Sequence, residues 1–160
     1  MPIDKNEAFT LLELIIVIII VGILATLGLT TYTTQVEYGR TAEAKANIAA
    51  MRKLAYEYFL KNGTLATVTA ADLGVGTNGL PNVCRSTHYY LYSFQNATSS
   101  RVYLYAYRCT TGSGGKTPDW SGHPYLLQYY FYPLGGAPYE TRSYDYTTGV
   151  WVEGYKVPPF

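Results

Sequence analysis

The sequence is short of the side chains on which metal and nucleophilic chemistry depend. It has two cysteines and two histidines in 160 residues, and none of them has a metal-ligand spacing such as CxxC or HxxxH. It also lacks the GxSxG motif, the P-loop and a GxGxxG loop after a strand, and the glycines of 112–115 (GSGG) indicate a flexible turn. A calcium loop around Asp119 has thin support, because Asp119 is the single acid of TPDWSGHP and calcium takes six to eight oxygen ligands. We therefore expect no enzymatic activity, no cofactor and no metal.

The chain also lacks an excess of positive or negative charge, because the formal net charge is only +1. This excludes the strong positive field of a sequence-independent nucleic-acid binder. Aromatic residues, by contrast, are plentiful: fourteen of the 18 tyrosines follow residue 88. The aromatic residues therefore belong to the C-terminal half of the chain. The length suits one compact domain with an extension.

The longest apolar run extends from Phe9 to Leu29, and its only polar side chains are Thr10, Glu13 and Thr26. A helix of this length rises about 31 Å, which matches the hydrocarbon thickness of a bilayer. The preceding residues are not a basic n-region, and no cleavage site for a secretory signal follows the run. We predict a membrane span, in which Glu13 either snorkels to the headgroups or has a functional partner.

The segment Ala8-Phe9-Thr10-Leu11-Leu12-Glu13, together with the apolar run, resembles the class III signal of the type IV pilin superfamily. The resemblance covers about the first fifty residues. It implies that a prepilin peptidase cuts between Ala8 and Phe9, removing residues 1–8, and N-methylates Phe9. It also implies that Glu13 meets the amino group of Phe9 on a neighbouring subunit. Ala8 stands where the family usually has Gly.

After residue 34 the pattern becomes amphipathic, which predicts that the helix of 9–34 continues as a head-packed helix over 35–62. Asn62-Gly63 is a stop signal, because Gly adopts the left-handed conformation of a helix C-cap without penalty. The apolar stripe at helical spacing consists of Ala44, Ile48, Met51, Ala55, Tyr58 and Phe59.

Residues 63–160 are expected to form a loop and a small sheet. Residues 64–82 lack periodicity, apart from one helical turn at 70–73, and are followed by aromatic-rich runs typical of strands. The expected strands are 88–94, 101–109, 125–132 and 142–152. The fold class is therefore α+β, with a long N-terminal helix packed on an antiparallel sheet of about four strands.

Cys84 precedes the first expected strand and Cys109 ends the second, so hairpin pairing would bring them together. In an exported protein they are most simply one disulfide, closing a loop of about 25 residues and contributing roughly 3 kcal/mol. Asn62 and Asn96 match the glycosylation acceptor pattern, which is common by chance.

The tyrosines allow two interpretations: they cover a half-buried sheet, or they form an exposed surface for subunit packing, a glycan or DNA. Alternation places Tyr103, Tyr105 and Tyr107 on one face, opposite Leu104 and Ala106. The basic residues expected to flank such a surface are Arg85, Arg101, Arg108 and Lys116.

The resemblance implies a structural subunit of an extracellular type IV pilus-like filament, a homo-polymer whose precursor is stored in the inner membrane. The alternatives are a type II secretion pseudopilin working in the periplasm and a minor pilin acting as an adhesive or DNA-binding tip. A monomeric membrane-anchored binding domain is a further class, and it predicts no polymer.

Overall fold

The computed structural model describes residues 10–77, 79–118, 120, 123–136 and 140–159. These belong to two compact units, Met1–Val36 and Glu37–Phe160. One helix, α1 (Leu11–Asn62), contributes to both units. The second unit, the head, contains the rest of α1 and all of the strands.

Within the head, α1 is held to the sheet by the predicted stripe. Ala44, Ile48, Met51 and Ala55 are at most 2% exposed, and Tyr58 and Phe59 pack against the same core while staying partly exposed. The helix ends at Asn62, as predicted, and Gly63 follows with a φ of 70°. The Gly63 N–H donates to the Phe59 carbonyl, so one of the last carbonyls of the helix is capped.

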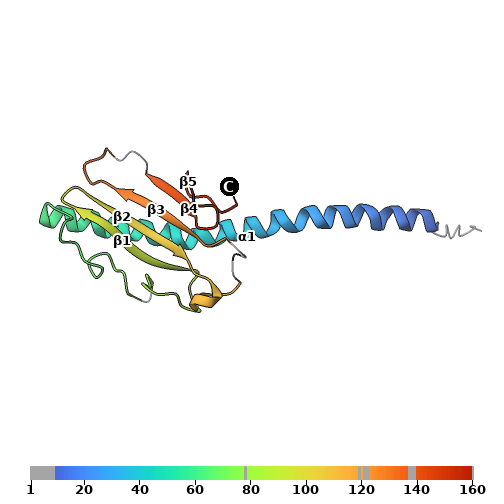
Figure 1. Ribbon diagram of the computed structural model, residues 1–160, viewed down its shortest axis with the longest axis horizontal. Helices are drawn as coiled ribbons and strands as arrows, with labels where there is room; N and C mark the ends of the chain where they lie inside the picture. Colours follow the sequence, from blue (N-terminus) through green and yellow to red (C-terminus); the bar gives the residue numbers. More distant parts are fainter. Residues whose placement is uncertain (1–9, 78, 119, 121–122, 137–139, 160) are drawn as a thin grey trace, which may run out of the picture. The chain divides into compact units, whose positions relative to one another are not determined.

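Five antiparallel strands form a simple meander in the order β1-β2-β3-β4-β5. Figure 1 shows this sheet lying across the head part of α1, with the segment that follows the helix running beside β1. The strands are β1 (Tyr90–Thr98), β2 (Arg101–Arg108), β3 (Tyr125–Phe131), β4 (Thr141–Asp145) and β5 (Val150–Glu153).

The fifth strand corrects the expectation of about four. The run 142–152 was expected as one strand, but it folds back on itself after Asp145, whose carboxylate accepts from Thr147 N–H and whose carbonyl accepts from Gly149 N–H. Gly149 has a φ of 71°, a conformation that favours glycine, so the TTG sequence is a tight turn rather than extended chain. The α+β class is confirmed.

The described residues of 64–89 (64–77 and 79–89) complete the core although they form no helix or strand. Leu65, Leu73 and Leu80 are buried in the same cluster as the helix stripe and the inner face of the sheet. The expected turn at 70–73 is present, since Leu73 N–H donates to the Thr69 carbonyl, and Asp72 accepts from the Thr69 N–H at 2.8 Å.

Candidate functional site

The first half of α1 has an apolar surface that the described chain leaves uncovered. Large apolar residues occupy most positions from Leu11 to Leu29, and the least exposed of them, Ile15, is still 41% exposed. The most apolar stretch of 18 residues in α1 has a mean hydropathy of 2.8, so by length and composition the helix can cross a membrane. Such a surface is stable only in lipid or against other apolar helices.

Glu13 closes the first turn of this helix on Thr10. Its Oε2 accepts from the Thr10 backbone N–H at 2.9 Å and from the Thr10 hydroxyl at 2.8 Å, while the Glu13 N–H donates to the Thr10 Oγ1 at 3.3 Å. This is a capping box, in which two side chains satisfy each other's backbone donors. Sequence reasoning missed it, although the T-x-x-E pattern was present as a signal. The carboxylate therefore has a partner within its own chain.

The segment around Glu13 also matches a known family. The model for the prokaryotic N-terminal methylation motif matches residues 3–29, which include the class III signal and most of the exposed apolar helix. This match supports the resemblance of the chain to the type IV pilin superfamily. No solved structure matches the chain.

Pilins and pseudopilins share this signal, and it implies processing by a prepilin peptidase and assembly from a membrane-anchored precursor. The predicted cleavage between Ala8 and Phe9, and the methylation of Phe9, fall outside the described residues. The pairing of Glu13 with Phe9 of a neighbouring subunit stays a prediction, and it would have to compete with the capping box shown here.

The head of this pilin-like chain has an aromatic outer face, the side of the sheet turned away from α1. Tyr103 and Tyr130 pair across β2 and β3 with ring centroids 4.5 Å apart, and Tyr144 and Trp151 pair across β4 and β5 at 4.7 Å. The alternation predicted for β2 is confirmed, because Leu104 and Ala106 are fully buried in the core. This outer aromatic face consists of Tyr103, Tyr105, Tyr107, Tyr130, Tyr144 and Trp151.

The rings of the outer aromatic face cover one another to a large extent. Tyr105 is only 7% exposed, and its hydroxyl accepts a hydrogen bond from the Gln128 side chain at 2.7 Å. Burial, and then the neighbouring tyrosines, raise the pKa of Tyr105 to about 12. Trp151 is the most open ring of this face at 38% exposure, and the Arg142 guanidinium lies 4.8 Å from its centroid. Tyr105 therefore fits the first interpretation, a tyrosine that covers a half-buried sheet, whereas binding of a partner by this face stays a prediction.

Arg108 does not flank this surface, contrary to the sequence-based expectation. It lies on the inner side of β2 and forms a buried ion pair with Glu37 of α1, with its Nε 2.6 Å from Glu37 Oε1. Arg101 does lie on the outer side, 5.6 Å from the centroid of Tyr103. The parity of β2 contained the signal, because position 108 shares a face with 104 and 106.

The Glu37 carboxylate is fully buried and has four donors. Besides Arg108 Nε and Nη2, it accepts from the Tyr125 hydroxyl at 2.8 Å and from Arg40 at 2.8 Å. Burial alone would raise the pKa of Glu37, but the hydrogen bonds and charge of Arg108 hold it below the ordinary value. Glu37 also has a sequence signal, since it continues the helix stripe through Thr41 to Ala44.

The remaining predicted residues are the two cysteines. Cys84 and Cys109 form a disulfide with a Cα–Cα distance of 5.6 Å, which confirms the pairing. The bridge joins the loop before β1 to the residue after Arg108, so it lies beside the ion pair. In the part of the chain that the structure describes, no group of three or more His, Cys, Asp or Glu could hold a metal ion. Asp119 lies outside the described residues.

Proposed function

We propose that this chain is the structural subunit of an extracellular type IV pilus-like filament. The observation that carries the proposal is the exposed apolar half of α1, directly behind the methylation motif. Transfer of this helix from lipid into a bundle of like helices exchanges one apolar environment for another, so packing and polar contacts decide the register. The head, with its buried core, then forms the outside of the polymer.

In this proposal Glu13 specifies the register between subunits. A carboxylate within an apolar span is costly unless it has a partner, and the amino group of Phe9 becomes available only after the leader is removed. The capping box supports the carboxylate before assembly, when Thr10 is its donor. During assembly, Glu13 Oε2 then either accepts a further bond from the Phe9 amine of the neighbouring subunit or exchanges its bonds with Thr10 for that bond.

The test is a Glu13→Leu variant, compared with Glu153→Leu on the exposed surface of β5 as a matched loss of a carboxylate. We expect both variants to remain in the membrane fraction, and only Glu13→Leu to lose ordered filaments in electron micrographs. Normal filaments from Glu13→Leu would overturn the role of this residue. A mass spectrum of the mature protein showing residues 1–8 intact would overturn the predicted processing.

A second candidate function is adhesion by a minor, tip-located pilin, and the outer aromatic face favours it. Trp151 and Arg142 offer an open ring and a guanidinium on the same face. Retention of the intact protein on immobilised glycan or DNA, abolished by Trp151→Ala, would support this function.

A pseudopilin is distinguished by its secretion-gene neighbours and by the absence of filaments on intact cells. We propose no catalytic role for any of these forms.

A further inference from the structure

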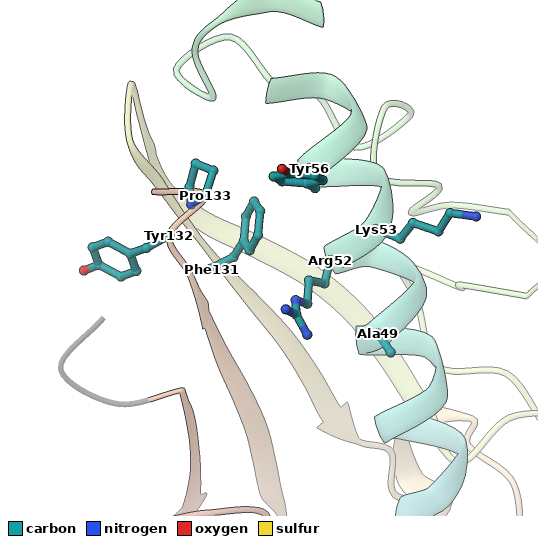
Figure 2. Close-up of a pocket in the computed structure, with 7 residues that line it drawn as sticks. All are labelled: Ala49, Arg52, Lys53, Tyr56, Phe131, Tyr132 and Pro133. Carbon is teal, nitrogen blue, oxygen red and sulfur yellow. The ribbon is translucent and has the colours of Figure 1, made fainter. Parts of the chain in front are cut away.

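A cavity of about 340 Å³ opens in the head between α1 and the end of β3. Figure 2 shows Arg52 and Tyr56 reaching into it from the helix, while Phe131 and Pro133 close it from the strand side. The side chains of Lys53 and Tyr132 also line it, but they point away, to either side. The cavity therefore presents one inward cation, Arg52, against apolar rings.

The cation in this cavity has no acidic partner among the residues that the structure describes. Arg40 and Arg108 both pair with Glu37, whereas Arg52 forms no ion pair within 4.0 Å and no side-chain hydrogen bond there. Its guanidinium instead lies 5.5 Å from the centroid of the Tyr129 ring. A guanidinium held against a ring keeps its N–H edge free for a planar anion, and a carboxylate fits that edge with two hydrogen bonds.

The walls of the cavity suit a ring rather than an extended chain. Tyr56 is 46% exposed and packs edge-on against Phe131, with centroids 6.4 Å apart and planes at 88°. Together with Pro133 these two rings form an apolar wall beside the Arg52 guanidinium. Ligand sites commonly combine such walls with a few placed polar groups.

We propose that this cavity binds a single sugar ring that carries a carboxylate, a uronic acid at the end of a glycan. The carboxylate pairs with the edge of Arg52, and the C–H face of the ring packs on Tyr56 and Pro133.

A nucleic acid fits this cavity less well. Its phosphates would need several cations along a groove, and of the two cations among the labelled lining residues, Arg52 and Lys53, only Arg52 points inward. Carboxylates also stand at the rims: Glu57 lies 3.9 Å from Lys53, and Glu140 lines the adjoining hollow of about 300 Å³. These rim charges disfavour any polyanion.

The test uses the full chain in detergent micelles and titrates two probes by ligand-observed NMR. The probes are methyl glucuronide and the neutral methyl glucoside, which differ in the carboxylate. We expect the wild type to bind the glucuronide saturably and to bind the glucoside about tenfold more weakly. The Arg52→Gln variant is expected to bind the glucuronide about tenfold more weakly than the wild type does. Arg52→Lys retains the charge but loses the planar fork, so it is expected to bind at an intermediate strength.

The matched control is Lys45→Gln, because Lys45 is an exposed cation of the same helix that also lies over a ring, 6.0 Å from the centroid of Tyr155. It removes the same charge outside the cavity, and it is expected to leave glucuronide binding unchanged. Equal binding of the two probes would overturn the proposal, as would an Arg52→Gln variant that binds normally. A thymidine oligonucleotide that outcompetes the glucuronide at Arg52, or loss of self-association in Arg52→Gln, would assign the cavity to nucleic acid or to a second copy instead.

Discussion

Replacing Arg108 by Met tests how strongly the buried ion pair holds the helix to the sheet. The variant keeps a side chain of similar length but removes the two donors to Glu37, at 2.6 and 3.2 Å. Glu37 is fully buried, so its charge stays in a site of low polarity with only Tyr125 and Arg40 as donors.

Breaking a buried pair by removing one partner costs about 3–5 kcal/mol, because the other charge is left without compensation. Arg40 remains 2.8 Å from Glu37 and is itself partly exposed, so we expect the lower end of this range, about 3 kcal/mol. For a head of this size, that corresponds to a fall of about 10 °C in Tm. A double variant, Glu37→Leu with Arg108→Met, removes both charges and is expected to lie within about 1 kcal/mol of the wild type. The Tyr125 hydroxyl then still has the Tyr90 hydroxyl at 2.6 Å.

The assay is urea unfolding of the full chain in a mild detergent, followed by the near-UV circular dichroism of the tyrosines and extrapolated to water. Arg85→Met, at an exposed loop position, is the matched control and is expected to change the free energy of unfolding by less than about 0.5 kcal/mol. The reasoning is refuted if Arg108→Met costs under about 1 kcal/mol, or if the double variant is as unstable as the single one.

Three more predictions concern the same end of the head. The pKa of Glu37 is lowered in the folded state, so the ionised carboxylate stabilises the fold fully above the unfolded pKa of about 4.3, and this stabilisation is lost as the pH falls through the folded pKa. The difference in free energy of unfolding between the wild type and Glu37→Gln, measured by urea unfolding, should therefore shrink below about pH 4 and stay constant above pH 6. Replacing Cys84 and Cys109 together by Ala should lower the free energy of unfolding by about 3 kcal/mol, and an unchanged urea midpoint would contradict this. Gly115→Ala should destabilise the head, because its Cβ would collide with the Cys109 Cβ and lie 2.9 Å from the Thr110 carbonyl oxygen. Gly112→Ala meets nothing nearer than 3.9 Å, so it should melt like the wild type.

The sequence alone determined the features that depend on short-range pattern. The helix stripe and the alternation along β2 follow from periods of 3.6 and 2, and the stop at Asn62-Gly63 follows from the left-handed conformation of Gly; the structure has all three. The class III signal likewise depends on contiguous residues, so the family could be inferred before any fold was known. The capping box of Thr10 and Glu13 and the inward position of Arg108 were also encoded locally, but were not inferred.

Only the tertiary structure decided which distant residues meet. Glu37 and Arg108 are 71 positions apart, and their pairing depends on how α1 lies across the sheet, which no local pattern specifies. The same packing leaves Arg52 facing a cavity while Arg40, three turns earlier on the same helix, is paired. A helix pattern states which side of the helix is buried. The neighbours that a charge finds there depend on the register between helix and sheet, which is fixed by the core as a whole.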